Sequence, residues 1–380
     1  MAFLLYAGWT LMGLGLAGGI CAVAAAWFVA RVLSRAPGPA PDPLPAVTVL
    51  KPLHGDEPSL EDALASFLAQ NYAAPVQIVF GLQDEADPAR AVVARLKANF
   101  PNRDIAIVIN PQRHGTNRKV SNLINMMGAA KHDVLVLADS DIHVPSDYLA
   151  TVVAALARPG AGAVSCLYTG KGVAGAWSRF AAMAINYHFL PNAALGIASG
   201  LAHPCFGSTI ALSRETLGAM GGFAAFADYL ADDYEIGRAV RAAGKSIAYP
   251  PLTVTHGSTE TGPGALMAHE LRWARTIRVI DPVGHWGSIV THAFALGLIG
   301  AALLGFTPLS CVVLAAILAA RLFLKARIDH IVGESAGPFW LLPARDVLSF
   351  GLFAASLFGT AVEWRGARLR VDERGAMSHY

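Results

Sequence analysis

Two uncharged stretches flank the middle of the chain, because residues 1–30 and 286–320 contain no Asp, Glu, Lys or Arg. A membrane-spanning helix needs about 20 apolar residues, so the first stretch predicts a transmembrane helix within residues 1–35. The second stretch is too long for one untilted span. Gly305 and Pro308 in its middle favour a turn, so residues 286–327 are predicted to form a transmembrane helical hairpin.

A third apolar stretch covers residues 337–362 and is interrupted by Arg345 and Asp346. A charge pair inside a bilayer is costly. We therefore expect this segment to be interfacial, re-entrant or a short span that begins at Val347.

The basic residues that flank the apolar stretches predict the orientation. Arg31 and Arg35 directly follow the first helix, and the positive-inside rule places that end in the cytoplasm. The arginines of residues 363–380 predict a basic cytoplasmic tail, so three spans fit better than four. No basic segment precedes the first helix, and its apolar stretch is longer than that of a signal peptide, which disfavours cleavage.

The middle of the chain has the charge balance of a soluble domain. Residues 36–45 contain five prolines and predict a stiff linker. Within residues 46–264, short apolar runs alternate with segments of helical spacing, which predicts an α/β domain with a mostly parallel sheet. The strand-like runs are Val47–Leu50, Val76–Leu82, Ile105–Ile109 and Val134–Ala138, and the helical segments are Leu60–Gln70, Arg90–Asn99 and Val120–Ala130.

Polar residues just after these strands are the first functional candidates, because ligands of such sheets bind beyond the carboxyl ends of the strands. Asp139-Ser140-Asp141 follows the run that ends at Ala138. Two carboxylates at this spacing can face one cation, and oxygen ligands suit Mg²⁺ or Mn²⁺. The alternative is turn chemistry, which Asp and Ser also favour.

Two further acidic positions have both a functional and a structural explanation. Asp84 follows the run that ends at Leu82 and is placed to hold a base or ribose, although the acidic segment around it also suits a helix N-terminus. Asp232 and Asp233 open another predicted helix. If Asp232 caps that helix, Asp233 is available as a general base; alternatively, both acids stabilise the helix dipole.

Residues 265–285 predict an amphipathic interfacial helix directly before the hairpin. His269, Arg272 and Trp273 share one helical face. Arg can hold phosphate oxygens, and Trp favours the membrane interface. The alternative is an ordinary basic helix that anchors the domain on the membrane.

Composition supports a membrane protein and leaves three more candidates. The chain has 380 residues, of which 54% are hydrophobic and 15% charged, and its net charge of +2 gives no reason to expect a nucleic-acid partner. The four cysteines form no CxxC pair. Lys51 and Lys119 are candidates for phosphate contacts, and His256 is a candidate metal ligand.

The order of these motifs resembles a known family. Asp84, the Asp139–Asp141 pair, Asp233 and a downstream Arg-Trp ahead of membrane helices match the pattern D, D, D, (Q/R)xxRW. This is similar to the ceramide glucosyltransferase branch of the family-2-like glycosyltransferases, which have the GT-A fold. The runs 51–55, 117–123 and 205–209 also fit that branch. Within it, the chain is most similar to the bacterial group associated with hopanoid biosynthesis.

The resemblance implies a role for each matched residue. Asp84 would contact the uridine of a UDP-sugar, and Asp139, with Asp141 beside it, would serve the diphosphate and metal. Asp233 would be the general base, and Arg272 and Trp273 would hold the diphosphate and shape the acceptor entrance. His269 departs from the Gln or Arg of the family pattern but can still donate a hydrogen bond at the entrance.

The implied activity is inverting sugar transfer at the cytoplasmic face of a bacterial inner membrane. The hopanoid group implies UDP-N-acetylglucosamine as the donor and a polyhydroxylated hopanoid such as bacteriohopanetetrol as the acceptor. The alternative within the branch is UDP-glucose with ceramide or another lipid. A transporter or membrane scaffold would not need the ordered acidic set, and three spans leave little wall for the channel of a processive polysaccharide synthase.

Overall fold

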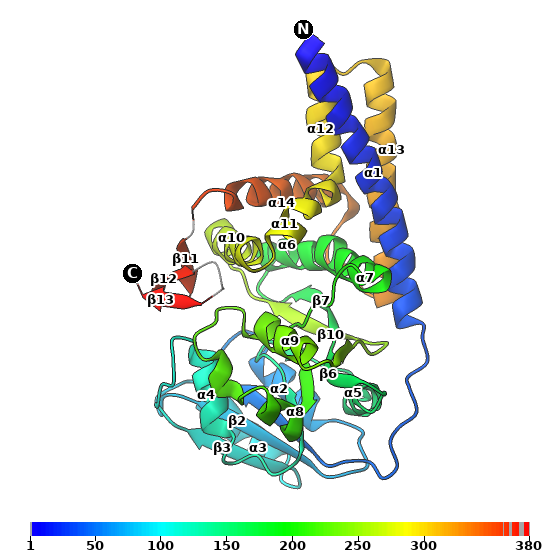
Figure 1. The fold of residues 1–380 in the computed structure, drawn as a ribbon. Coiled ribbons are helices and arrows are strands. Elements are labelled where there is room, and N and C mark those ends of the chain that lie inside the picture. The colour runs from blue at the N-terminus through cyan, green and yellow to red at the C-terminus, as the bar shows by residue number, and fades with distance from the viewer. Residues whose placement is uncertain (1, 360, 365–366, 372–375, 380) are drawn as a thin grey trace.

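A seven-stranded sheet forms the centre of the lower domain (Figure 1). The computed structural model describes residues 2–359, 361–364, 367–371 and 376–379. Only β8 runs against its neighbours in this sheet, which confirms the predicted mostly parallel arrangement. In spatial order the strands are β3 (Asp104–Ile109), β2 (Val76–Leu82), β1 (Val47–Pro52), β4 (Val134–Leu137), β8 (Ile210–Ser213), β6 (Ala161–Ser165) and β9 (Ser246–Ala248).

Helices cover both faces of this sheet because successive strand residues point to opposite sides. In β1, Val49 packs into one hydrophobic cluster and Leu50 into the other. The first cluster includes residues of α2 (Leu60–Leu68), α3 (Ala89–Asn99) and α5 (Tyr148–Leu156). The second includes residues of α4 (Arg118–Met126), α8 (Arg214–Ala219), the 3-10 helix η2 (Phe223–Phe226) and α9 (Asp232–Ala242).

A second, three-stranded sheet lies between the main sheet and the helices above it (Figure 1). It consists of β5 (Ile142–His143), β10 (Thr253–Ser258) and β7 (Leu167–Gly172), in that order. β10 pairs antiparallel with β5 and parallel with β7. Because β5 begins directly after Asp141, this small sheet fixes the direction in which the chain leaves β4.

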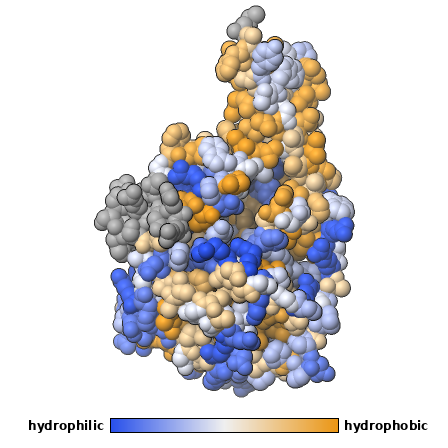
Figure 2. Space-filling model, viewed as in Figure 1, coloured by the Kyte–Doolittle hydropathy of each residue, from blue (hydrophilic) through white to orange (hydrophobic). Residues whose placement is uncertain are grey.

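Three apolar helices form the column that rises from the domain (Figure 1): α1 (Ala2–Leu33), α12 (Ala293–Leu303) and α13 (Pro308–Val332). Among the described residues, α1 and α13 are each long and apolar enough to cross a membrane. The count rises to three if α12 and the bent segment Pro282–Thr291 before it, which meet at 62°, form one span. The surface of the column is mostly hydrophobic, whereas the lower domain shows hydrophilic patches beside apolar ones (Figure 2).

Several helices lie crosswise where the column meets the domain (Figure 1). The α10 helix covers most of the predicted interfacial segment and packs against α14. These elements are α6 (Ala176–Ala184), the π-helix η1 (Ile185–Phe189), α7 (Leu190–Ser199), α10 (Pro263–Ile280), α11 (Pro282–Gly287), the 3-10 helices η3 (Ser288–Thr291) and η4 (Phe339–Leu341), and α14 (Leu342–Ser356).

Arg345 and Asp346 both lie inside α14, so the helix begins before Val347. The two charged residues have separate partners. The Asp346 carboxylate pairs with Arg321 of α13 at 2.8 Å, and Arg345 pairs with Glu270 of α10. Each charge is therefore compensated by another helix, which the sequence pattern did not indicate. Whether α14 spans or lies on a membrane stays a prediction.

The C-terminal residues form a small antiparallel sheet of β11 (Ala361–Trp364), β12 (Ala367–Val371) and β13 (Met377–His379). The Met377 amide donates a hydrogen bond to the Asp228 carbonyl at 2.7 Å, which ties this sheet to the loop before α9. Two arginines of the predicted basic tail, Arg365 and Arg374, lie outside the described residues.

Candidate active site

The Asp139-Ser140-Asp141 motif occupies the segment between β4 and β5, as the strand pattern predicts. Lys51, at the end of the neighbouring strand β1, is fully buried and donates a hydrogen bond to the Asp139 carbonyl oxygen. Burial lowers the pKa of Lys51 to about 7, against the charges of Asp141 and Asp139. Lys51 therefore holds the main chain of the motif.

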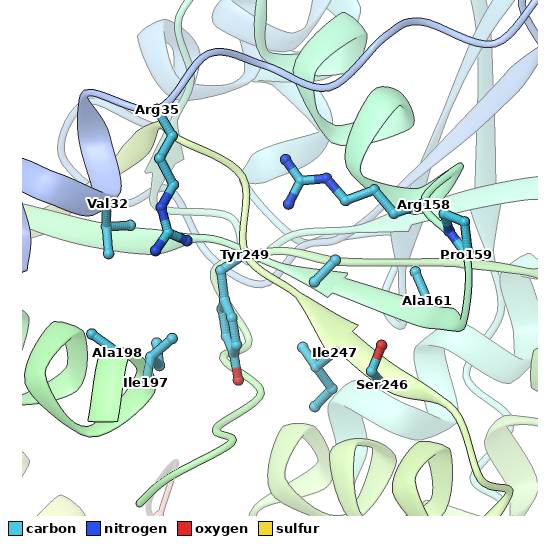
Figure 3. Close-up of a pocket in the computed structure, with 11 residues that line it drawn as sticks. Val32, Arg35, Arg158, Pro159, Ala161, Ile197, Ala198, Ser246, Ile247 and Tyr249 are labelled. Carbon is cyan, nitrogen blue, oxygen red and sulfur yellow. The ribbon is translucent and has the colours of Figure 1, made fainter. Parts of the chain in front are cut away.

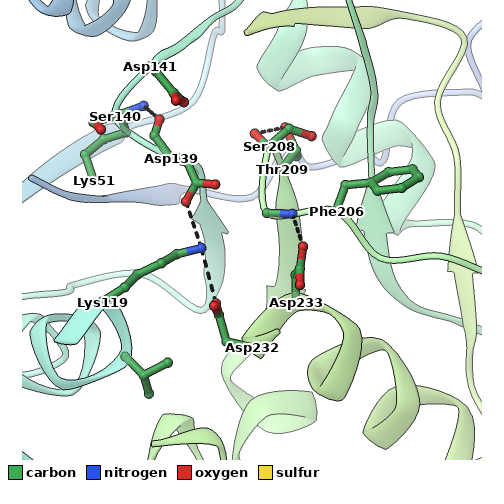
Figure 4. A network of polar contacts seen from close by, with 12 residues as sticks. Lys51, Lys119, Asp139, Ser140, Asp141, Phe206, Ser208, Thr209, Asp232 and Asp233 are labelled. Carbon is green, nitrogen blue, oxygen red and sulfur yellow. Dashed lines mark hydrogen bonds and ion pairs between the residues drawn. The ribbon is translucent and has the colours of Figure 1, made fainter. Parts of the chain in front are cut away.

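Lys119 links the motif to α9. Its ammonium lies 2.7 Å from Asp139 Oδ1 and 3.2 Å from Asp232 Oδ2, as Figure 4 shows. The Asn117 side chain caps α4 by accepting from the Val120 amide at 3.1 Å, so Lys119 lies in the first turn of that helix. Burial opposes the charge on Lys119, but the surrounding carboxylates outweigh it and raise its pKa, so the side chain is a permanent cation.

Asp233 lies in the first turn of α9 with both carboxylate oxygens engaged. Oδ2 accepts from the Gly207 amide at 2.9 Å, and Oδ1 accepts from the Tyr234 amide at 2.8 Å. Burial and the neighbouring charge of Asp232 raise the pKa of Asp233 to about 6, against the opposing charge of Lys119. A carboxylate with this pKa can accept a proton near neutral pH, which suits a general base.

Gly207 brings the Asp139 and Asp233 carboxylates together. A Cβ atom at this position would lie 2.8 Å from Asp139 Oδ2 and 3.5 Å from Asp233 Oδ2. Only glycine leaves room for the two carboxylates to approach the same stretch of backbone. The run 205–209 matches the family pattern, but the pattern alone does not predict this packing.

His256 of β10 faces the second carboxylate of the motif. Its Nε2 lies 3.1 Å from Asp141 Oδ2, because the β5–β10 pairing places His256 opposite Ile142. Burial raises the pKa of Asp141, but the charge and hydrogen bond of His256 together with the charge of Lys51 outweigh it, and the pKa falls to about 2. Burial likewise lowers the pKa of His256, but Asp141 raises it to about 9. The two side chains form an ion pair at neutral pH.

The α10 helix reaches the site through Trp273. Its ring contacts His269 on the same helix, with centroids 4.4 Å apart, and it meets His256 edge-on at 6.1 Å. His269 Nδ1 lies 2.6 Å from Glu260 Oε1. Burial lowers the pKa of His269. Burial opposes the charge of Glu260, but the hydrogen bond from His269 and the nearby imidazole charges together lower the pKa of Glu260. Glu260 was not among the sequence candidates, because no motif includes it.

A family model described as glycosyl transferase family 21 matches residues 10–377. The chain belongs to this family. A ceramide glucosyltransferase from Komagataella phaffii is 34% identical over 124 residues, which cover 32% of this chain and 24% of that protein. Ceramide glucosyltransferase 1 from Caenorhabditis elegans is 27% identical over 210 residues, which cover 54% of this chain and 44% of that protein. The matches thus span less than half of these relatives.

The fold of this family 21 chain is shared with a solved enzyme. A mannosyltransferase from Pyrobaculum calidifontis, solved in complex with GDP-Man and Mn²⁺, has a TM-score of 0.53 and 21% identity. The similarity covers 93% of this chain and 99% of that one and confirms the predicted GT-A-like fold. The relatives named above are ceramide glucosyltransferases, which agrees with the alternative from the sequence and gives no support to the hopanoid association.

The structure brings most of the predicted residues of this family 21 protein together, but not all of them. Asp84 is exposed, and its carboxylate accepts a hydrogen bond from the Ala86 amide. The nearby Asp87 is buried and accepts from the amides of Gly55 and Ala89. The expectation that Asp232 caps α9 was wrong: residue 231 holds the cap position, and Asp232 pairs with Lys119 instead.

The predicted metal site has part of its donor set in place. The expected convergence of both motif carboxylates is absent, because Asp139 faces Lys119 and Asp141 faces His256. No group of three His, Cys, Asp or Glu side chains within the described ranges is arranged to hold a metal. However, Asp141 Oδ1 is buried and has no hydrogen-bond partner among these residues. An unused, buried carboxylate oxygen is a ligand that would suit a divalent cation such as Mg²⁺ or Mn²⁺.

Proposed function

We propose that this family 21 protein transfers a sugar from a UDP-sugar to a hydroxyl group of a membrane lipid, with Asp233 as the general base. The observation that supports this most directly is the environment of Asp233. Its carboxylate is held by two backbone amides, lies beside the Asp139 group, and has a pKa raised to about 6. A purely structural helix-capping acid would not need this like-charged, partly buried setting.

The chemical step is a single displacement. The acceptor hydroxyl gives its proton to the Asp233 carboxylate as its oxygen forms a bond to the anomeric carbon of the sugar. The bond from that carbon to the diphosphate oxygen breaks, and its electron pair leaves with UDP. Because one carboxylate acts and no covalent sugar–enzyme intermediate forms, the configuration at the anomeric carbon inverts.

The rest of the site would bind the departing UDP. Asp141 would hold Mg²⁺ or Mn²⁺, which would neutralise charge on a leaving diphosphate. His256 would become a ligand beside it only after losing its ring proton, because a protonated imidazole has no free nitrogen lone pair. Arg272 would add a guanidinium suited to phosphate oxygens, and Asp84 would contact the uridine. Lys51 and Lys119 would act through the Asp139 segment, since both are bonded to it.

We further propose that the donor is UDP-glucose and the acceptor a ceramide-type lipid. The support is the set of curated relatives, which are ceramide glucosyltransferases. Trp273 and His269 would shape the entrance, since they connect the carboxylates to the crosswise helices at the foot of the column. The lipid hydroxyl would then approach sideways from the membrane.

A product assay tests the substrates. Purified full-length protein in nonionic detergent is incubated with radiolabelled UDP-glucose and ceramide, or with UDP-N-acetylglucosamine and bacteriohopanetetrol, and the lipid products are identified by mass spectrometry. We expect glucosylceramide from the wild type and from the surface control Asp147→Asn. Product from the hopanoid pair alone would overturn the ceramide assignment and favour the bacteriohopanetetrol alternative. If neither donor–acceptor pair yields a glycolipid, the enzyme does not use these donors with these lipids.

We propose that the catalytic domain faces the cytoplasm of a bacterial inner membrane. Arg31 and Arg35 follow α1, and nucleotide sugars are cytoplasmic metabolites. A single cysteine placed at the exposed Glu85, in a variant without the four native cysteines, should react with an impermeant thiol reagent only after lysis. Labelling in intact cells would contradict the cytoplasmic orientation of the catalytic domain.

A further inference from the structure

A cavity of about 320 Å³ lies where α1 meets the edge strand β9, away from the carboxylate site. Its walls come from the end of α1, from α7, from the loop before β6, and from β9 with the residues that follow it (Figure 3). Most of its lining residues are apolar, and none of them is Asp or Glu. The lining residues are Val32, Arg35, Arg158, Pro159, Ala161, Ile197, Ala198, Ser246, Ile247, Ala248 and Tyr249.

Two arginines point their guanidinium groups into this cavity. Arg35 comes from the segment directly after α1, and Arg158 comes from the loop between α5 and β6 (Figure 3). Within the described part of the chain, neither guanidinium has an ion pair or a side-chain hydrogen bond. An anion placed between two cations that have no other counter-charge would be stabilised by both.

The position along α1 places the cavity at the depth of lipid headgroups. The Arg31 guanidinium lies over the Trp27 ring at 5.2 Å, and Trp27 is 56% exposed. A Trp–Arg pair at the end of an apolar helix is typical of a membrane interface. Arg35 follows four residues later and lies just beyond the end of α1 at Leu33. The polar layer of one leaflet is roughly 5–8 Å thick, and a basic residue directly after an apolar helix is typical of that layer.

The apolar wall suits the rest of a lipid molecule. Val32 of α1 and Ile197 and Ala198 of α7 face the side of the cavity nearest the column. The Tyr249 hydroxyl is already used, since it donates to the Pro204 carbonyl at 2.6 Å, and it leaves the ring as a wall. The cavity therefore offers two cations for a phosphate and apolar contact for the carbon atoms attached to it.

We propose that this cavity binds the phosphate of an anionic membrane phospholipid and so fixes the edge of the catalytic domain to the membrane. The phosphate would lie between Arg35 and Arg158, with its glycerol carbons against Val32 and α7. Such a lipid would orient the domain beneath the column without entering the carboxylate site. The proposal does not depend on which sugar or acceptor the enzyme uses.

Native mass spectrometry of the full-length protein in nonionic detergent tests this site, with phosphatidylglycerol as the probe. The wild type should hold one phosphatidylglycerol molecule more tightly than any other. Arg35→Ala with Arg158→Ala should weaken this binding by roughly tenfold or more, because two charge-assisted hydrogen-bonding groups are lost. The matched control is Arg90→Ala with Arg95→Ala, which removes the same charge from the exposed face of α3.

Two further arms keep the result decisive. Ser246→Glu adds a carboxylate to the cavity from an exposed position and should weaken the same binding step even if the double variant folds poorly. Inorganic phosphate at 100-fold excess should not displace the lipid. Displacement by inorganic phosphate would identify a site for free phosphate, and undiminished lipid binding by both variants would overturn the proposal. Sugar transfer in detergent should continue in all variants, which separates this result from the catalytic assignment.

Discussion

The carboxylate group of the candidate site and the ion pairs at the foot of the helical column differ in charge balance. In the carboxylate group, one ammonium faces three acids, and the members are Lys119, Asp139, Asp232 and Asp233. The ion pairs at the foot of the column are matched one to one, as Arg321–Asp346 and Lys325–Asp329.

The cations of the matched pairs also donate hydrogen bonds to other polar groups. Arg321 donates to the Tyr187 carbonyl, and Lys325 donates to the Tyr187 hydroxyl and to Ser335. A buried pair with no spare charge fixes helices in place. The carboxylate group instead retains a negative excess, and burial together with the charge of Asp232 raises the pKa of Asp233 to about 6. The comparison indicates that unbalanced buried charge marks the site of chemistry and balanced buried charge marks the frame.

The largest expected effect comes from removing divalent cations. The acidic excess and the unused Asp141 oxygen predict that excess chelator reduces sugar transfer to background, and that added Mg²⁺ or Mn²⁺ restores it. The measurement is the transfer rate with and without chelator, with thermal unfolding as the control for intact protein. Full activity in excess chelator would show that the acidic excess does not serve a metal.

The next largest effect is expected from Asp233→Asn. The amide cannot accept the hydroxyl proton, so the turnover rate should fall by roughly a hundredfold or more. UDP binding, measured by calorimetry, should stay close to wild type because Asp233 bonds to backbone amides of the enzyme itself. Asp147→Asn, at an exposed position, is the matched control. Near-normal turnover in Asp233→Asn would show that Asp233 is not the general base.

Asp346→Asn should affect stability and leave the chemistry intact. It leaves Arg321 buried without its counter-ion, which typically costs about 3–5 kcal/mol. Denaturant or thermal unfolding measures this loss, and activity per folded molecule should persist. Asp104→Asn breaks the exposed Lys131–Asp104 pair, and this variant should lose no more than about 1 kcal/mol of unfolding free energy. Equal losses in both variants would erase the distinction between the two kinds of charge.

Replacing the whole pair sharpens the same point. Arg321→Leu with Asp346→Leu removes both charges, and similar replacements elsewhere are often neutral or stabilising. We expect the double variant to recover most of the stability lost in Asp346→Asn. A double variant as unstable as the single one would show that the pair contributes more than charge compensation.

The smallest expected effect is a shift in pH dependence. The base must be deprotonated, and its pKa is raised to about 6, so turnover should be constant above this pH and fall about tenfold per unit below it. Asp232→Asn removes a neighbouring negative charge that raises this pKa, so the acid limb of the profile should move to lower pH. An unchanged or upward-shifted limb in Asp232→Asn would contradict the coupling.

The strands could be predicted because each is a short apolar run of the length that a buried strand requires. β2 spans the predicted Val76–Leu82 without change, and β4 ends one residue before the predicted Ala138. The antiparallel β8 and the small sheet of β5, β10 and β7 were not predicted, since pairing partners lie far apart in the chain. Arg345 misled the reasoning about α14 because its partner, Glu270, lies on another helix.

The sequence by itself determined the acidic candidates and the apolar helices, because strand ends and uncharged stretches are local features. Only the tertiary structure decided that Lys119 serves both Asp139 and Asp232, and that Gly207 sets the approach of Asp139 to Asp233. The tertiary structure also decided that Asp141 pairs with His256 rather than facing the same partner as Asp139, because β5 pairs with β10. The physical reason is that a charge's state depends on its neighbours in space, and those neighbours come from sheet order and helix packing rather than from spacing along the chain.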